Sequence, residues 1–229
     1  MSSFLIRTPV HLNRSFSRRI GKSLSATQKD LLEFNLPAHL YDKDTLGTFV
    51  AGKPLILEVG FGMGDHFINQ AKLNPHSIFI GAEPYLNGVA NALKLAKDQG
   101  ISNFLLWSDD LDIILSDMPD NILAGIYILF PDPWPKTKQL KKRILNIERL
   151  GIFKKKLKDG GFLVFASDID SYFEMVKKLI VSDKSFQLAD DDFTRPHANY
   201  ITTKYHQKSI DEGRTARFLK YRFNENSAK

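Results

Sequence analysis

Cysteine is absent from all 229 residues of the chain. That absence excludes disulfides, zinc sites built on cysteine and thiol nucleophiles, and it fits a protein of the reducing cytoplasm. No apolar run approaches the roughly 18 residues that a membrane-spanning helix requires. No group of His, Asp and Glu has the spacing of a metal site. We therefore expect a cytoplasmic protein without a bound metal and without a membrane partner.

Acidic residues are missing from the first 29 positions. Six basic residues in this stretch account for the net charge of +6, because the other 26 basic residues equal the 26 acidic ones. They are Arg7, Arg14, Arg18, Arg19, Lys22 and Lys29. Such a segment is typical of an organellar transit peptide, of an arm that grips nucleic acid phosphates, or of a solvated tail. We favour the arm, and we divide the chain into a basic N-terminal extension, residues 1–50, and a main domain, residues 51–229.

From Pro54 onwards, short apolar runs alternate with stretches of helical periodicity. The runs predict seven strands, over 55–59, 77–82, 103–107, 124–130, 162–166, 186–189 and 217–223. Helices are predicted over 27–34, 65–73, 87–98, 112–116, 141–158 and 171–181. Strands that alternate with helices predict a doubly wound, Rossmann-like α/β fold with a mostly parallel sheet. Ligands of such sheets bind beyond the carboxyl ends of the strands.

The first predicted strand runs into the sequence Glu58-Val-Gly-Phe-Gly-Met-Gly64. Its glycines allow a tight turn and a close approach of the backbone to a ligand. The turn does not match the dinucleotide fingerprint, since Asp65 or Phe67 stands at its last position, and it lacks the Gly-Lys-Ser/Thr of a phosphate-binding loop. It suits S-adenosylmethionine, which has no phosphate and carries a sulfonium and an ammonium that favour carboxylates.

Two acids at the ends of later strands are candidates for binding this cofactor. Glu83 follows the second strand and can accept hydrogen bonds from both ribose hydroxyls. Asp110 follows the third strand and can accept from the adenine amino group. The adjacent Asp109 competes for that role, and either acid can instead cap a helix. We place Gly60, Gly62, Glu83 and Asp110 in the predicted cofactor site.

A proline-rich loop, Phe130-Pro-Asp-Pro-Trp-Pro-Lys136, ends the fourth and most apolar strand. Three prolines in five positions stiffen the backbone and prevent ladder pairing. Trp134 can offer a face on which a base stacks, and Asp132 can accept hydrogen bonds from base N–H groups. The loop therefore predicts a site for a planar base, with a structural connection around a buried Trp as the alternative.

Five motifs together resemble the bacterial tRNA (guanine-N7-)-methyltransferase family in order and spacing. They are Glu58-Val-Gly-Phe-Gly-Met-Gly64, Gly81-Ala-Glu83, Phe130-Pro-Asp-Pro-Trp134 with Lys136, Ala166-Ser-Asp168 and Thr203-Lys-Tyr205. The segment Arg14–Arg19 is similar to the arm that precedes the family's catalytic domain, and the resemblance covers residues from about 14 to 223. It implies a class I methyltransferase sheet in residues 51–229, S-adenosylmethionine as cofactor, and methylation of a guanine N7 in the variable loop of tRNA.

The resemblance also implies roles for individual residues. The implied cofactor contacts are Glu58, Glu83, Asp110 and Asp132. The implied substrate contacts are Lys136, Asp168, Thr203, Lys204, Tyr205 and His206. The implied RNA contacts are Lys138, Lys141, Lys142 and Arg143. The sequence departs from the family at His206, where an acid usually follows the aromatic residue, and at Pro135, where a basic or polar residue is common.

The chemistry of the target atom limits what Asp132 has to do. Guanine N7 carries a lone pair and no proton, so its methylation requires alignment of the two reactants and no proton abstraction. We therefore interpret Asp132 as the catalytic residue that orients the base and stabilises the cationic product, with Asp168 sharing this work. The alternatives are an RNA methyltransferase for exocyclic amino groups and a non-catalytic RNA-binding module. The expected partner is tRNA, and the sequence indicates no obligatory protein partner.

Overall fold

The computed structural model describes Arg19, Gly21 and residues 23–225. Four of the six basic residues near the N-terminus lie outside the described residues, namely Arg7, Arg14, Arg18 and Lys22. The structure therefore describes only Arg19 of the predicted RNA-binding arm at 14–19.

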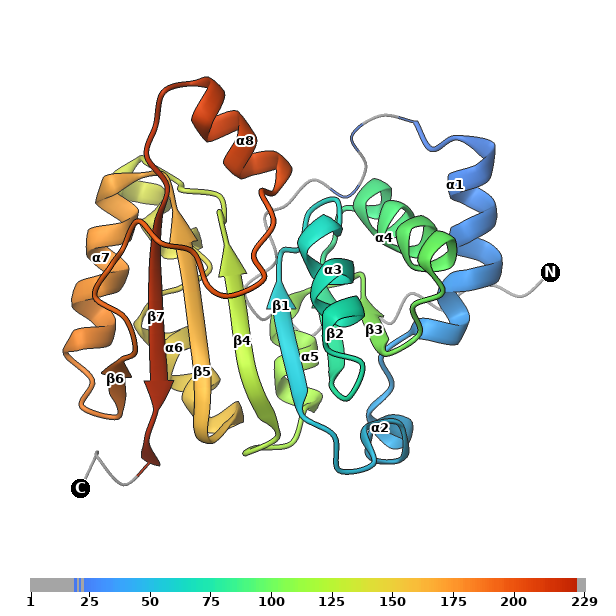
Figure 1. Ribbon diagram of the computed structural model, residues 1–229, viewed down its shortest axis with the longest axis horizontal. Coiled ribbons are helices and arrows are strands. Elements are labelled where there is room, and N and C mark those ends of the chain that lie inside the picture. Colours follow the sequence, from blue (N-terminus) through green and yellow to red (C-terminus); the bar gives the residue numbers. More distant parts are fainter. Residues whose placement is uncertain (1–18, 20, 22, 226–229) are drawn as a thin grey trace.

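A seven-stranded sheet forms the centre of the molecule (Figure 1). Its strands are β1 (Leu55–Val59), β2 (Ile78–Ala82), β3 (Phe104–Trp107), β4 (Leu123–Leu129), β5 (Leu157–Ser167), β6 (Phe186–Leu188) and β7 (Arg217–Phe223). They lie in the order β3-β2-β1-β4-β5-β7-β6, and β7 runs in the direction opposite to the other strands. The predicted doubly wound, mostly parallel sheet is confirmed.

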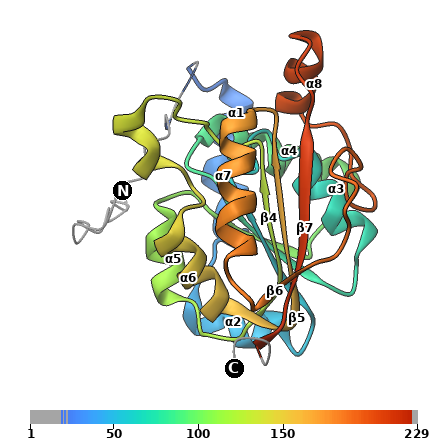
Figure 2. The same ribbon diagram turned by 90° about the vertical axis from the view of Figure 1, so that its left-hand side faces the viewer.

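Helices cover both faces of the sheet (Figure 2). One face carries α1 (Ala26–Asp30), the π-helical turn η1 (Leu31–Asn35), the 3₁₀ helix η2 (Leu36–His39), α3 (Asp65–Leu73) and α4 (Leu86–Gln99). The other face carries α2 (Lys43–Val50), α5 (Leu111–Asp117), α6 (Ile147–Lys156) and α7 (Asp170–Val181). Two elements stand beyond the carboxyl ends of the parallel strands, the 3₁₀ helix η3 (Thr137–Lys142) and α8 (Lys204–Asp211).

Strand β1 shows how the sequence builds a core on each face. All five of its residues are buried, and successive side chains of a strand point to opposite faces. Leu55, Leu57 and Val59 therefore join the core that packs against α5, α6 and α7. Ile56 joins the core under α3 and α4. Glu58 points to this same face, so its carboxylate is directed toward α3 rather than toward solvent.

The N-terminal part packs on the sheet before residue 51 is reached. Ser25 and Gln28 form a capping box at the start of α1. Tyr41, Leu46 and Val50 are buried in the core under α5 and α6. The hydrophobic core thus continues across the boundary that we expected at residue 50.

The predicted helix over 141–158 is wrong at both ends. Asn146 caps α6, because its Oδ1 accepts a hydrogen bond of 2.9 Å from the N–H of Arg149. The preceding residues form η3, and the chain enters β5 at Leu157 rather than at 162. The apolar spacing over 144–157 had suggested one continuous helix, and the capping asparagine interrupts it.

Candidate active site

A cleft of about 1050 Å³ opens beyond the carboxyl ends of the strands, where the strand order reverses between β1 and β4. The glycine loop after β1, the acid after β2, the proline loop after β4 and helix α8 all contribute to its walls. Nine predicted site residues line it, namely Gly60, Gly62, Glu83, Asp110, Asp132, Lys141, Lys142, Lys204 and Tyr205. The cleft therefore collects residues from both the predicted cofactor site and the predicted RNA site.

Glu83 and the glycine loop hold each other in place. The carboxylate Oε2 accepts a hydrogen bond of 2.8 Å from the N–H of Gly62, and Oε1 accepts one of 2.9 Å from the N–H of Tyr85. Gly62 has a φ of +58°, which side chains with a Cβ rarely adopt. Helix α4 also approaches closely, since a Cβ on Gly88 would lie 1.9 Å from the carbonyl oxygen of Gly62.

The Glu83 carboxyl group is poised to titrate near neutrality. Its side chain is only 7% exposed, and burial raises the pKa of Glu83 from 4.5 to about 7. The two backbone hydrogen bonds lower the pKa, while the negative charges of Asp132 and Glu58 raise it. A positive ligand beside Glu83 would stabilise the ionised form.

Asp110 both caps a helix and faces the cleft. Its Oδ1 accepts a hydrogen bond of 2.8 Å from the N–H of Asp112 at the start of α5. Its carbonyl oxygen accepts one of 2.7 Å from Trp107 Nε1. The neighbouring Asp109 also lines the cleft, 4.0 Å from the guanidinium of Arg19. The cap fixes Asp110 at the cleft wall, and its contact with adenine stays a prediction.

The proline loop has a constrained backbone at two non-glycine residues. Phe130 has a φ of +51° and Trp134 a φ of +39°, conformations that cost such residues about 1–3 kcal/mol each. Phe130, Asp132 and Trp134 all line the cleft, and the ammonium of Lys142 lies 4.8 Å from the centre of the Trp134 ring. The loop therefore presents a carboxylate and an indole in one fixed arrangement.

Arg143 holds this loop from inside the protein, and its predicted contact with RNA stays a prediction. Arg143 is only 3% exposed, which does not favour that contact. Its Nε donates a hydrogen bond of 2.8 Å to the carbonyl oxygen of Pro133, and its guanidinium lies 4.4 Å from the centre of the Tyr172 ring. Sequence alone placed Arg143 in a run of exposed lysines and gave no sign of its burial.

Helix α8 forms a wall of the cleft beside the proline loop. The predicted turn at 203–206 is its first turn, where Thr203 Oγ1 accepts a hydrogen bond of 3.1 Å from the N–H of His206. Tyr205 lies against Gly62, and burial, Glu83 and Asp132 raise the pKa of its hydroxyl. Lys208 lines the cleft one turn after Lys204. The sequence interpretation missed Lys208, because its spacing from Lys204 is meaningful only on a helix.

Several predicted site residues do not line the cleft. Asp168 Oδ2 instead accepts a hydrogen bond of 2.7 Å from Arg214 Nε. The ring of His206 stacks on Phe130 at 5.1 Å, and its Nδ1 lies 2.8 Å from the Tyr200 hydroxyl. The complete set outside the cleft wall is Glu58, Lys136, Lys138, Arg143, Asp168, Thr203 and His206.

Glu58 has its partner inside the protein. Its Oε2 lies 2.8 Å from Nδ1 of His66, and the two side chains are 2% and 1% exposed. The predicted contact between Glu58 and the cofactor is untested. Glu58 projects from the face of β1 that α3 covers, and its carboxylate therefore reaches His66 of that helix.

Within residues 23–225 and at Arg19 and Gly21, no cluster of three or more His, Asp or Glu side chains could hold a metal ion. Among these same residues, no helix combines the length and the apolar character that crossing a membrane requires.

The strand order with an antiparallel β7, the glycine loop after β1 and the buried acid after β2 define a class I methyltransferase fold. A solved structure of the 16S rRNA methyltransferase KamB has this fold, with a TM-score of 0.60, 14% identity, and coverage of 80% of this chain and 94% of that one. Residues 52–219 match a protein family described as "Putative methyltransferase".

Two groups of curated relatives define the family more closely. A tRNA (guanine-N(7)-)-methyltransferase of Hyphomonas neptunium is 36% identical over 207 residues, which are 87% of this chain and 94% of that protein. A bifunctional methyltransferase of Rickettsia conorii is 55% identical over 219 residues, which are 95% of this chain and 41% of that protein. The chain thus spans less than half the length of the Rickettsia relative. It belongs to the tRNA (guanine-N7-)-methyltransferase family.

Proposed function

We propose that this protein transfers a methyl group from S-adenosylmethionine to N7 of a guanine in the variable loop of tRNA. The observation that carries the proposal is a single cleft lined by the glycine loop, by Glu83 and by Asp132, with lysines on two of its walls. The relatives that are named tRNA (guanine-N(7)-)-methyltransferases support the choice of RNA and of atom.

The residues of the cleft fit S-adenosylmethionine. Seven acids line it, and four of them follow strands of the sheet, namely Glu83, Asp109, Asp110 and Asp132. Their negative charges match the positive sulfonium and ammonium groups. A Cβ on Gly60 would meet nothing within 4 Å, so the glycine loop leaves room for a ligand against the backbone. When bound, S-adenosylmethionine supplies an electrophilic methyl group. Glu83 would hold the ribose and Asp110 the adenine in this arrangement.

Asp132 would orient the guanine and stabilise its developing charge. It is exposed on the rigid proline loop at the cleft wall, so its carboxylate can accept hydrogen bonds from base N–H groups. The methylated base is cationic, and a fixed carboxylate nearby lowers the energy of that charge. Proton abstraction is unnecessary because N7 has a free lone pair.

Lysines on two walls of the cleft would bind the RNA backbone. Lys141 and Lys142 lie on the η3 wall, and Lys204 and Lys208 lie on the α8 wall. The major groove of an A-form helix is too narrow for side chains to reach N7. The target base must therefore be unstacked, and phosphate contacts beside the cleft would offset the cost of that deformation.

The proposal is tested by incubation with labelled S-adenosylmethionine and unmodified tRNA, followed by strand cleavage specific for N7-methylguanine. We expect cleavage at one guanine of the variable loop. Label on an exocyclic amino group would favour the amino methyltransferase instead. RNA binding without any methyl transfer would favour the non-catalytic module.

A matched pair of variants assigns the role of Asp132. Asp132→Asn is expected to lower kcat by roughly a hundredfold, because an amide cannot stabilise a cation as a carboxylate does. Asp30→Asn, an exposed acid on α1, is the control and is expected to leave kcat unchanged. Equal kcat values for the two variants would remove Asp132 from the reaction.

A further inference from the structure

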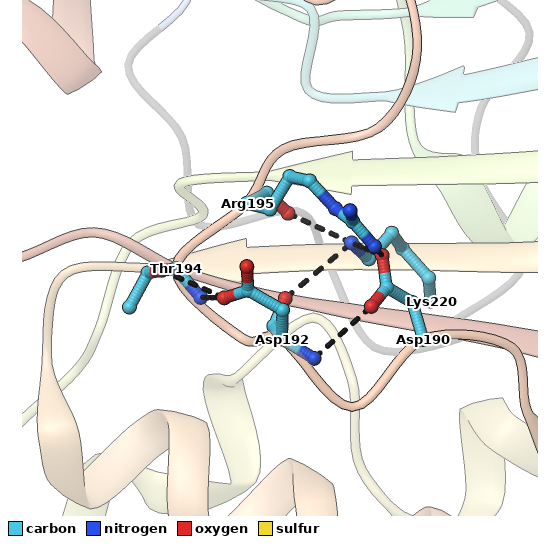
Figure 3. A network of polar contacts seen from close by, with 5 residues as sticks. All are labelled: Asp190, Asp192, Thr194, Arg195 and Lys220. Carbon is cyan, nitrogen blue, oxygen red and sulfur yellow. Dashed lines mark hydrogen bonds and ion pairs between the residues drawn. The ribbon is translucent and has the colours of Figure 1, made fainter.

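Residues 189–203, called here the connecting segment, run from the end of β6 to the start of α8. Lys220 of β7 holds the first half of this segment (Figure 3). Its ammonium donates hydrogen bonds to Asp190 Oδ2 and, at 2.8 Å, to the carbonyl oxygen of Arg195. Hydrogen bonds from Lys220, Arg195 and the N–H of Asp192 hold the pKa of Asp190 well below its usual range. The first half is thereby fixed to the sheet.

One face of α3 holds the second half. The two Nε2 atoms of His66 and His197 lie 2.8 Å apart. Gln70, one turn after His66, donates a hydrogen bond of 2.9 Å to the carbonyl oxygen of Asn199. Beneath His66 lies Glu58 at the end of β1, so a chain of hydrogen bonds runs from the first strand through α3 to the connecting segment.

Two arrangements of protons satisfy this chain when Glu58 is ionised. A carboxylate can only accept, so Nδ1 of His66 carries a proton in both. The hydrogen bond between the two Nε2 atoms is donated either by His197 or by His66. In either arrangement Nδ1 of His197, a buried atom, has no hydrogen-bond partner among the described residues. Burial lowers the pKa of His197 to about 3, so its neutral form persists at neutral pH.

The anchored segment leads directly to the cleft wall. The N–H of Tyr200 donates a hydrogen bond of 3.3 Å to the carbonyl oxygen of His197. The Tyr200 hydroxyl lies 2.8 Å from His206 Nδ1 and accepts a bond of 3.5 Å from the N–H of Thr203, which caps α8. Tyr205 in the next turn lies against Gly62.

We propose that the buried chain Glu58–His66–His197 is a positioning device that fixes α8 against the glycine loop. Helix α8, which carries the lysines proposed to bind RNA, is thereby held against the glycine loop, which is proposed to bind the cofactor. His197 and His66 touch neither ligand in this arrangement, and they act through Tyr200 and Thr203. The consequence for RNA binding rests on the proposed function, whereas the consequence for the order of α8 does not.

Two substitutions at His197 separate the hydrogen bond from the packing. His197→Leu fills the space without a donor and leaves Nε2 of His66 buried and unpaired. His197→Gln retains an N–H donor. His76→Leu, an exposed histidine after α3, is the control. We expect His197→Leu to raise the KM for tRNA roughly tenfold with kcat within twofold, and we expect His197→Gln to restore most of that loss.

Hydrogen–deuterium exchange tests the anchor without any RNA. In His197→Leu, amides of residues 197–211 should exchange at least tenfold faster, while those of β1, β4 and β5 keep their protection. Tyr200→Phe removes only the hydroxyl and should accelerate exchange in α8 alone, which provides the test if His197→Leu does not fold. Unchanged exchange in α8 in the folded variants overturns the proposal. Faster exchange with no RNA methylation by the native protein would leave the anchor in place and refute the proposed function.

Discussion

The titration of Glu83 predicts a pH dependence for cofactor affinity. In the proposed function, the ionised carboxylate would accept from ribose hydroxyls and attract the positive charges of S-adenosylmethionine, whereas the protonated form would do neither as well. With a pKa of about 7, the ionised fraction falls from about nine tenths at pH 8 to about one tenth at pH 6. We therefore expect the affinity to weaken roughly tenfold over this interval.

The same shift predicts the sign of a change in stability. A carboxyl group whose folded pKa is raised binds its proton more tightly in the folded protein than in the unfolded chain. The unfolding free energy contributed by Glu83 is therefore highest below pH 4.5 and decreases as pH rises toward 7. The shift from 4.5 to about 7 corresponds to about 3 kcal/mol. A bound cofactor offsets this loss, so ligand protection should grow with pH.

Calorimetric titration with S-adenosylmethionine at pH 6, 7 and 8 measures the effect. Glu83→Gln should weaken binding at least tenfold at pH 8 and should bind equally at all three pH values. An amide can accept from only one of the two N–H groups of Gly62 and Tyr85 without turning its own donor toward the other. Glu33→Gln, an exposed residue of η1, is the control. A pH dependence that survives in Glu83→Gln would show that another group titrates and would refute the reasoning.

Three further variants test the walls of the cleft. Arg143→Met should lower the unfolding free energy in urea by about 2–4 kcal/mol, because it removes a buried hydrogen bond to the proline loop. Weaker tRNA binding at unchanged stability would instead support the predicted contact between Arg143 and RNA. Lys141→Ala combined with Lys142→Ala should reduce the salt dependence of tRNA binding by up to about two phosphate contacts, and an unaltered slope would contradict that role. Gly88→Ala should displace the glycine loop and weaken cofactor binding, since the new Cβ would lie 1.9 Å from Gly62 O. A cofactor affinity equal to the native value would show that helix α4 moves to make room for the methyl group.

The sheet was predictable because each strand is marked by its own apolar run. The runs at 55–59 and 217–223 match β1 and β7 in full, and the other five strands were placed with some error at their ends. Helix α6 was extended too far because its apolar spacing continues across Asn146, whose side chain caps the helix and donates a hydrogen bond of 3.2 Å to the carbonyl oxygen of Arg143. Periodicity reports the spacing of apolar residues, whereas the start of this helix is set by a polar side chain that the spacing does not register.

The candidate site was predictable where a residue follows a strand directly. Gly62, Glu83 and Asp132 reach the cleft because the parallel strands deliver their carboxyl ends to one edge. Asp168 also follows a strand, but Arg214, distant in sequence, pairs with it. Pairings across such a separation leave no local pattern in the sequence.

His206 shows how a departure from the family can be accommodated. Where an acid is usual, its ring stacks on Phe130 and hydrogen-bonds with Tyr200, and burial lowers its pKa. A neutral imidazole in this position links α8 to the proline loop. Lys208 was missed for a related reason, since α8 itself was not predicted.

The antiparallel direction of β7 has a consequence for how ligand specificity can change on this fold. β6 pairs with the end of β7 that is far from the cleft, and the connecting segment returns along β7 and α3 to the cleft edge, where α8 and the start of β7 lie (Figure 1). Residues 204–216 therefore form one excursion that begins and ends on the cleft side of the sheet. Insertions or replacements within that excursion can remodel the substrate wall while the five parallel strands keep their pairing. Among relatives with different nucleic acid targets, we expect sequence divergence to concentrate there.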